Sequence, residues 1–393
     1  NNMYPKSDVL AKILPYHNHK KIKIGYFSPD FKNHPVSFLT AELYEIHDRQ
    51  KFEIHAFSFG QDTKDEFNIR IKKGVDYFHD VQMISNLDVV KLARSLEIDI
   101  AIDLAGFTRD ARTNIFAMSS APIQVNYLGY PGTMGADYMN YLIADHILIP
   151  NKKKIHYSEK IVFMPNSYMP NDSKTKLSEK IFKREDFGLP KDGFVFCCFN
   201  KYYKITPTTF TRWMKILSKV DKSVIWLSSG NNTAMNNLKK EARKNGIDEN
   251  RLIFAERVPL MEDHLSRIKL ADLFLDTLPF NAHATAIDAL RMEVPILTCK
   301  GNSFASRVAA SLLNSVNLPE MITLSQDQYE SLAIELASNP KKLKIIKDKL
   351  KNNLPTAPLF NTSLYAQHLE AAYLIMYERN QNKLDIEDIK IDY

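Results

Sequence analysis

Lys204 is the residue of this sequence whose surroundings best suit chemistry on a departing anion. It lies two residues before Thr206 and Pro207, a pair typical of the start of a helix. The unpaired amide groups of a helix N-terminus attract anions. An ammonium group beside them could neutralise the charge that builds on a departing phosphate. A lysine that is only exposed to solvent could have the same neighbours in the sequence, so both interpretations are open.

A second loop, residues 278–288, offers more groups that could hold a diphosphate. Backbone amides near residues 283–285 would be first-turn donors without a partner inside the helix, and the His283 ring and the Thr285 hydroxyl add side-chain donors. Asp288 follows Thr285 by three residues, so both project from one helix face. A carboxylate placed there suits ribose hydroxyls. The alternative is a helix-capping segment with a solvated aspartate.

Three other loops carry weaker signals. His34 follows the first strand and could act as a general base, although a histidine that hydrogen-bonds loop backbone is the simpler interpretation. His264 stands early in a helix, five residues after Pro259, where histidines usually cap helices or meet solvent. The segment 129–133 is rich in turn residues and follows a strand. It consists of Gly129, Tyr130, Pro131, Gly132 and Thr133.

Short β-rich runs alternate with helical patterns along the whole chain. The expected strands are residues 22–28, 52–59, 98–105, 124–129, 194–200, 223–229, 252–255, 273–277 and 295–298. The clearest expected helices are residues 36–49, 87–96 and 362–379. Many of the strands are apolar on both faces, as buried parallel strands are. The pattern predicts two successive doubly wound parallel α/β sheets, with ligands beyond the carboxyl ends of the strands in a cleft between them.

The polar segment 166–190 has little β pattern and marks the expected join between two domains. The predicted order is a lead-in, an N-terminal Rossmann-like domain, a linker, a C-terminal Rossmann-like domain, a helix and a frayed tail. The corresponding residues are 1–20, 21–165, 166–190, 191–360, 361–379 and 380–393.

Composition and missing motifs narrow the possible functions. A net charge of +6, without a basic block interleaved with aromatics, gives no support for a nucleic-acid partner. The three cysteines suggest neither disulfides nor zinc, and no segment approaches the ~20 apolar residues of a membrane helix, so a cytoplasmic protein is expected. The sequence contains no Walker A loop, no GxGxxG opening the first helix and no Asp-x-Asp motif. We therefore expect a diphosphate to be held without a metal ion, and no cofactor.

Taken together, these loops resemble glycosyltransferase family 41, the O-linked N-acetylglucosamine transferases. The resembling segments follow the order of the family over roughly residues 21–378 and are most similar to bacterial members. They are residues 25–31 with 33–35, residues 121–125 with 128–133, residues 199–200 with 203–205, residues 281–285 and residues 305–311. The resemblance implies a GT-B fold and a UDP-sugar donor, commonly UDP-GlcNAc.

The resemblance also implies roles for the residues of these loops. Lys204 matches the lysine that supports the leaving diphosphate, and Asp288 matches the carboxylate that binds the ribose. The residues matched to donor or acceptor binding are Asn281, His283 and Thr285 at the pyrophosphate, His264 with Pro259 beside the nucleoside, residues 129–133 around the sugar, and His34 on the acceptor side.

Three positions depart from the pattern of the family. Ala284 stands where many members have threonine, so the diphosphate site has one hydroxyl fewer. Met261 replaces a lysine that the animal enzyme has near the ribose. Lys201, near the phosphates in place of a common glutamine, would compensate for weaker nucleotide binding.

The function expected from the resemblance is inverting, metal-independent transfer of a sugar, N-acetylglucosamine by preference, from UDP to Ser or Thr of proteins. The alternatives are transfer of glucose from UDP to Asn, transfer of fucose from GDP, and a non-catalytic nucleotide-binding relative. Having both His283 and Asp288 favours UDP over GDP-fucose. Tetratricopeptide repeats usually precede the catalytic part in this family, and they are absent from this chain, so either an excised piece or a missing segment is expected.

Overall fold

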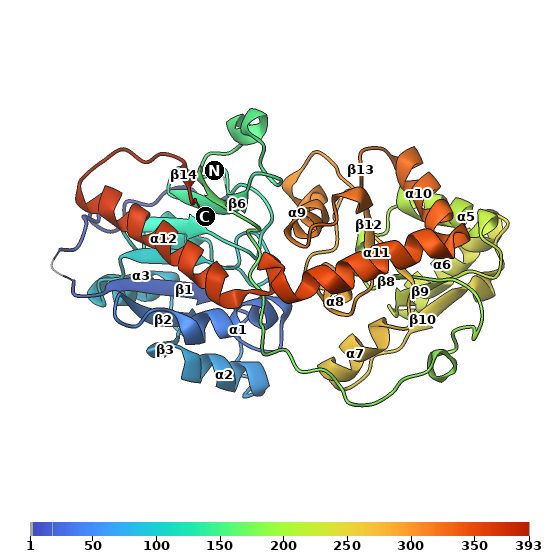
Figure 1. Ribbon diagram of the computed structural model, residues 1–393. Helices are drawn as coiled ribbons and strands as arrows, with labels where there is room; N and C mark the ends of the chain where they lie inside the picture. Colours follow the sequence, from blue (N-terminus) through green and yellow to red (C-terminus); the bar gives the residue numbers. More distant parts are fainter. Residues whose placement is uncertain (1–2, 18, 393) are drawn as a thin grey trace. The chain divides into compact units, whose positions relative to one another are not determined.

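The computed structural model describes residues 3–17 and 19–392 (Figure 1). Contacts divide the chain into two compact units. The first takes in the described residues as far as Ser173 and again from Pro358, and the second runs from Lys174 to Ala357. The first crossing between the units falls inside the segment predicted as the linker. We describe each unit by itself.

The sheet of the first unit has eight described strands in the order β14-β7-β6-β5-β4-β1-β2-β3, all parallel. The strands are β1 (Ile22–Ser28), β2 (Phe52–Ser58), β3 (Tyr77–Asp80), β4 (Ile100–Asp103), β5 (Ile123–Asn126), β6 (Tyr141–Asp145), β7 (Lys160–Met164) and β14 (Ile389–Lys390). Strands β1, β2, β4 and β5 lie where the sequence predicted them, whereas β3, β6, β7 and β14 were not anticipated. The central strands are buried on both faces, as parallel strands between helix layers must be.

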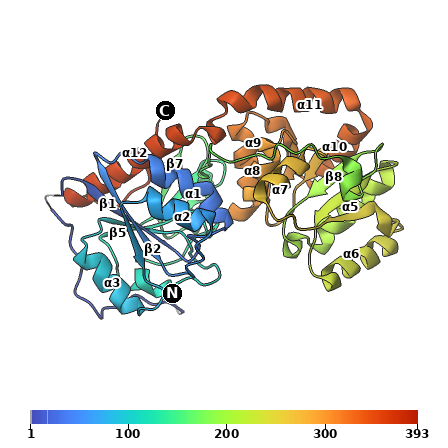
Figure 2. The same cartoon turned by 90° about the horizontal axis from the view of Figure 1, so that it is seen from below.

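Helices cover both faces of this sheet (Figure 2). They are α1 (Pro35–Ile46), α2 (Glu66–Gly74), α3 (Asn86–Ser95), α4 (Asn114–Ala117) and α12 (Thr362–Gln381), with short 3-10 helices at Asn151–His156 and Pro358–Phe360. α1 packs against α2 and α12, and α3 packs against α4 on the other side of the sheet. The C-terminal helix therefore belongs to the first unit, although it follows the second unit in sequence.

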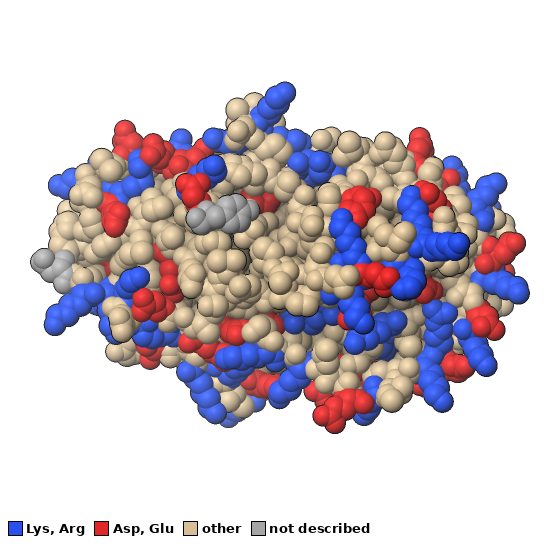
Figure 3. Space-filling view, viewed as in Figure 1, with Lys and Arg blue, Asp and Glu red and all other residues tan. Residues whose placement is uncertain are grey.

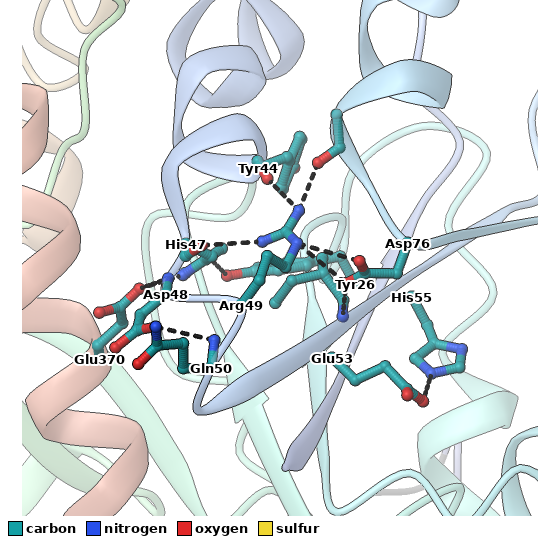
Figure 4. Close-up of polar contacts among 12 residues, drawn as sticks. Tyr26, Tyr44, His47, Asp48, Arg49, Gln50, Glu53, His55, Asp76 and Glu370 are labelled. Atoms are coloured by element: carbon teal, nitrogen blue, oxygen red, sulfur yellow. Dashed lines mark hydrogen bonds and ion pairs between the residues drawn. The ribbon is translucent and has the colours of Figure 1, made fainter.

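Buried polar contacts hold α12 against the first sheet (Figure 4). His47 Nδ1 lies 2.9 Å from a carboxylate oxygen of Glu370, which can only accept, so this nitrogen donates. His47 Nε2 then accepts from the Tyr26 hydroxyl at 2.8 Å, and that oxygen lies 3.1 Å from the Tyr373 hydroxyl. Because α12 contributes Glu370 and Tyr373, the helix is fixed by directed bonds as well as by apolar packing.

The prediction that the chain frays after residue 379 was wrong. α12 continues to Gln381, and residues 389–390 add the edge strand β14 beside β7. The Asp388 carboxylate accepts from the backbone N–H of Ile161 at 2.8 Å. A strand of two residues carries too little pattern to be recognised in sequence, and its pairing depends on a distant edge.

The second unit has a sheet of six described strands in the order β10-β9-β8-β11-β12-β13, also parallel. The strands are β8 (Val195–Cys198), β9 (Val224–Ser228), β10 (Leu252–Ala255), β11 (Leu273–Leu275), β12 (Ile296–Cys299) and β13 (Ile322–Thr323). Five of them follow the prediction, and β13 was missed. The two parallel α/β sheets confirm the predicted fold class.

The helices of the second unit are α5 (Pro207–Lys219), α6 (Asn232–Lys244), α7 (Met261–Ile268), α8 (Ala284–Arg291), α9 (Val308–Ser315), α10 (Gln326–Ser338) and α11 (Pro340–Asn353). α10 packs on α5, and α8 packs beside α7 and α9. Basic residues outnumber acidic ones in this unit, whereas acidic residues outnumber basic ones in the first, and Figure 3 shows lysines and arginines over α11. The second unit is the one whose net charge suits an anionic ligand.

Candidate functional site

The strand order of the second sheet creates a switch point between β8 and β11. The chain leaves β8 toward β9 and β10 on one side, and the later strands β11, β12 and β13 are added on the other. Loops that follow the two strands diverge at such a point, and ligands of doubly wound sheets bind there. The loops after β8 and β11 contain Lys204 and His283, two of the residues singled out from the sequence.

Lys204 ends a short 3-10 helix, Tyr202–Lys204, just before α5. Thr206 caps α5 by accepting from the backbone N–H of Thr209, and Pro207 is the first helical residue, as the sequence predicted. The Lys204 ammonium donates to the carbonyl of Asn281 at 2.9 Å and lies 4.0 Å from the centre of the Phe280 ring. Partial burial lowers the pKa of Lys204 to about 8, against the opposing pull of Asp276. The structure thus brings Lys204 to the loop that precedes α8.

A chain of side-chain contacts joins the start of α8 to the loop after β8. The Thr285 hydroxyl donates to the side-chain oxygen of Asn200 at 2.6 Å, and the Asn200 amide donates to the Thr277 hydroxyl at 2.8 Å. α8 begins at Ala284, and the N–H groups of Ala286 and Ile287 donate to the carbonyl of His283 at 2.9 and 3.3 Å. Among the described residues, the N–H groups of Ala284 and Thr285 have no such acceptor. Thr285 has one hydroxyl proton, so it must leave Asn200 before it can donate to a phosphate.

His283 precedes α8 and lies in apolar surroundings. Its ring stacks on Phe280 at 4.8 Å between centroids, and its Nε2 is 3.5 Å from the carbonyl of Ala305. Burial and the neighbouring Lys204 lower the pKa of His283 to about 3. The imidazole is therefore neutral near pH 7 and has one N–H to offer, so it contributes a hydrogen bond and no positive charge.

Asp288 lies one turn beyond Thr285 on α8, as the spacing predicted. Burial raises the pKa of this carboxyl to about 7, with Arg291 opposing. Within the described residues, no hydrogen bond to another side chain or to backbone satisfies the Asp288 carboxylate. The Asp288 side chain is partly exposed, so its carboxylate is accessible to the hydroxyls of a bound sugar or ribose.

His264 comes from α7 and lies beside the end of β8, with its ring edge-on to Phe199 at 5.5 Å. The Arg267 guanidinium lies 3.1 Å from His264 Nδ1. Because a guanidinium only donates, Nδ1 holds the lone pair and the ring proton is on Nε2. Burial, together with Arg267, lowers the pKa of His264 to about 4, so the ring is a neutral donor through Nε2.

Three further predicted residues of this unit lie on the same loops without tight contacts. Lys201 is exposed at the start of the 3-10 helix, Pro259 is exposed before α7, and Ala284 is the first residue of α8. Their side chains make no hydrogen bond or ion pair to another residue in the described parts of the chain. Their assignment to ligand binding stays a prediction.

Sequence reasoning missed several residues that build this site. Asn200 and Asp276 lie just after strands β8 and β11, and both are buried polar residues, as is Arg267 on α7. Position at a strand end was a usable signal for the first two. Arg267 stands three residues after His264, one helical turn away, which could have suggested the contact.

In the first unit, the predicted loop Gly129–Thr133 follows β5 and is closely packed. A Cβ on Gly129 would lie 2.0 Å from the carbonyl oxygen of Leu104, so only glycine fits. The Asn126 amide donates to the carbonyl of Gly132 at 2.9 Å. The buried Glu159 carboxylate accepts from the Thr133 hydroxyl and from the following backbone N–H, both at 2.6 Å.

The other two members of that loop are half-buried. The Tyr130 ring meets Phe107 edge-on at 5.3 Å, and Pro131 sits between Tyr130 and Gly132 at the turn. The Gly132 N–H donates to the carbonyl of Tyr130 at 3.0 Å. The loop therefore has one defined shape, whatever it binds.

His34 serves as the N-cap of α1. Its Nδ1 accepts from the backbone N–H of Val36 at 3.3 Å and lies 3.5 Å from a carboxylate oxygen of Asp30. Burial lowers the pKa of His34, and Asp30 opposes that shift. The backbone contact matches the simpler interpretation of this histidine, and a role as a base stays a prediction.

Among the residues that the structure describes, no three His, Cys, Asp or Glu side chains are grouped to hold a metal ion. Likewise, no described helix is long and apolar enough to cross a membrane.

The profile described as "Glycosyl transferase family 41" matches residues 11–184 and 171–369. The chain belongs to this family. The resemblance seen in the loops is thereby confirmed at the level of the family.

Curated relatives agree with this placement. A protein of Arabidopsis thaliana described as a probable UDP-N-acetylglucosamine–peptide N-acetylglucosaminyltransferase, SEC, is 37% identical over 91% of this chain and 37% of its own length. The UDP-N-acetylglucosamine–peptide N-acetylglucosaminyltransferase of Caenorhabditis elegans is 26% identical over 95% of this chain and 42% of its own length. The chain thus spans about two fifths of these relatives.

Solved structures support the GT-B fold. A mutant of the Thermobaculum terrenum O-GlcNAc transferase superposes with a TM-score of 0.89 at 26% identity, covering 97% of this chain and 73% of that one. Anabaena HepE in complex with UDP gives a TM-score of 0.58 at 12% identity, over 90% of this chain and 100% of that one, which is a likeness of fold alone.

Proposed function

We propose that this chain is the catalytic part of a protein glycosyltransferase that moves N-acetylglucosamine from UDP to Ser or Thr hydroxyls, with inversion and without a metal ion. The observation that carries the proposal is the meeting of Lys204, the start of α8 and Asp288 at the switch point of the second sheet. The names of the family-41 relatives supply the donor and the kind of acceptor.

We propose that the donor-side residues bind the UDP-sugar in the following way. The backbone N–H groups of Ala284 and Thr285 at the start of α8 suit the pyrophosphate, with Asn281 and His283 beside them. The unsatisfied carboxylate of Asp288 suits ribose hydroxyls. The Nε2–H of His264 and the exposed Pro259 are proposed to lie beside the base, and Lys201 adds an exposed positive charge.

The reaction we propose is a single displacement at the anomeric carbon. The acceptor oxygen forms a bond to that carbon on the face opposite the diphosphate, and the bond to the β-phosphate oxygen breaks with its electron pair. Negative charge grows on the diphosphate, where the Lys204 ammonium and the α8 amides stabilise it. The acceptor proton passes to His34 or to a water relay. One displacement inverts the anomeric configuration.

The acceptor side is proposed to be the loop Gly129–Thr133 of the first unit, whose shape is fixed by Asn126 and Glu159. Acceptor selection is proposed to need protein upstream of this chain, in line with the larger size of the relatives. A cytoplasmic location is proposed because the three cysteines are buried and free of disulfides.

A panel of nucleotide sugars tests the donor. Calorimetric titration with UDP, UDP-GlcNAc, UDP-glucose and GDP-fucose should give measurable binding of the uridine ligands and weaker binding of the guanosine ligand. Tighter binding of GDP-fucose would overturn the choice of UDP. Binding of UDP-GlcNAc without hydrolysis or transfer would point to a non-catalytic relative.

A further inference from the structure

Asp276 is a buried carboxylate at the end of β11 for which the proposed mechanism has no use. Its side chain is 4% exposed and accepts three hydrogen bonds. One oxygen accepts from the backbone N–H of Thr277 at 2.8 Å and from that of Ala282 at 2.6 Å. The other accepts from the Thr298 hydroxyl on β12 at 2.6 Å. Each of these donors favours the charged form of the carboxylate, against the opposing effect of burial.

These bonds tie together the two ends of the loop that carries the donor site. Thr277 begins the β11–α8 loop and Ala282 stands just before His283, so one carboxylate oxygen clamps both ends. The same loop offers the carbonyl of Asn281 to the Lys204 ammonium, and Asn281 in turn donates to the carbonyl of Thr277. The position of Lys204 therefore depends on the clamp made by Asp276.

Lys204 has no carboxylate in direct contact among the described residues, since its ammonium meets the Asn281 carbonyl and the Phe280 ring. A carboxylate bonded directly to the ammonium would compete with the leaving diphosphate. A carboxylate held behind the loop by neutral donors keeps its negative charge near the amine and leaves the amine open to a ligand.

We propose that Asp276 is a positioning residue of the donor site, which clamps the β11–α8 loop and supplies the negative charge that keeps Lys204 protonated. This inference rests on the proposed function for its consequence in catalysis, whereas the effect on Lys204 exists without any reaction.

The directions of the shifts agree with this geometry. Burial raises the pKa of Asp276 to about 6, with Thr298, Ala282, Thr277 and Lys204 opposing. Burial lowers the pKa of Lys204 to about 8, and Asp276 is the largest group that opposes the fall. The two groups are thus both charged between about pH 6 and pH 8.

Apart from Asp288, the other titratable groups that face this pair stay neutral between about pH 6 and pH 8. His283 has a pKa of about 3 and is neutral, and burial raises the pKa of Cys198 on β8, of Cys299 on β12 and of Tyr329 on α10. Asp288, with a pKa of about 7, does titrate there. A loss of activity at acidic pH therefore does not distinguish Asp276 from Asp288. For this reason the titration of the Lys204 amine itself must be observed.

The test is an NMR titration of the lysine side-chain signals in the ligand-free protein, with Lys204 assigned by Lys204→Arg. Asp276→Asn should lower the Lys204 midpoint by about one pH unit, since an opposite charge in the vicinity moves a pKa by about that much or more. The alkaline limb of kcat/KM should move down by the same amount, because that quantity reports the free enzyme.

Thr298→Val provides a second variant in case Asp276→Asn does not fold. It removes one donor to the carboxylate and should shift the Lys204 midpoint in the same direction by less. Thr323→Val is the matched control. It removes a buried hydroxyl that donates to the carbonyl of Thr298 and not to Asp276, so it should leave the Lys204 midpoint unchanged. An unchanged Lys204 midpoint in folded Asp276→Asn would overturn the inference. A shifted midpoint in a protein that transfers no sugar would keep it and reject the proposed function instead.

Discussion

Replacing Lys204 by alanine should reduce turnover far more than it reduces the affinity for the donor. In the proposed site the amides at the start of α8 bind the ground-state diphosphate, whereas additional charge appears only as the glycosidic bond breaks. At an effective dielectric constant of about 20, unit charges about 4 Å apart attract by about 4 kcal/mol. Only part of a full charge develops in the transition state, so we expect kcat to fall about 10²–10³-fold.

The assay is steady-state transfer by Lys204→Ala, with donor affinity measured separately by calorimetry and folding checked by an unchanged melting temperature. Lys215→Ala, an exposed lysine on α5, is the matched control and should behave like the parent protein. A near-normal kcat with a raised KM would make Lys204 a simple anchor for the diphosphate, and its role toward the leaving group would have to be abandoned.

Three more outcomes follow from the site and the fold. Asp288→Ala should weaken the binding of UDP about tenfold or more and the binding of inorganic pyrophosphate less. Thr285→Val should weaken the binding of pyrophosphate at least as much as that of UDP. If calorimetry shows equal losses for both ligands in Asp288→Ala, Asp288 does not contact the ribose. UDP should bind equally well in excess chelator, and a loss of more than about tenfold would reject metal-free binding. Burial alone would lower the pKa of His19, but hydrogen bonds to Glu97 and Asp99 outweigh it and hold the pKa above its usual value. The contribution of His19 to the free energy of unfolding is thus complete below about pH 6.5 and is lost as the pH rises through the raised pKa. His19→Asn should therefore lower the free energy of unfolding by about 1–2 kcal/mol near pH 6 and by less near pH 9. Urea denaturation at the two pH values measures this difference.

The fold could be predicted because most of its strands are apolar runs that alternate with helices. Strand β1 was placed to the residue, since it lies between a polar lead-in and a turn. Strand β3 was missed because it is an edge strand with exposed ends and a mixed sequence. Strand β14 depends on pairing with a distant partner that sequence does not reveal.

The sequence indicated which loops carry the candidate residues, but not the contacts that those residues make. The cap at Thr206 placed Lys204 before a helix, because capping is a local property. The contact between Thr285 and Asn200 joins residues 85 positions apart, and the clamp made by Asp276 joins two strands. Such contacts depend on which strands are neighbours, which local pattern does not specify.

The most direct test of the central claim is transfer itself. The chain is incubated with UDP-GlcNAc and a Ser- and Thr-containing protein acceptor in the presence of chelator, and the product is examined by mass spectrometry and by NMR of the anomeric proton. The account predicts one N-acetylhexosamine on a Ser or Thr oxygen, in inverted configuration, with release of UDP and with loss of product in Lys204→Ala. Transfer from GDP-fucose instead, attachment to Asn, or retained configuration would contradict it.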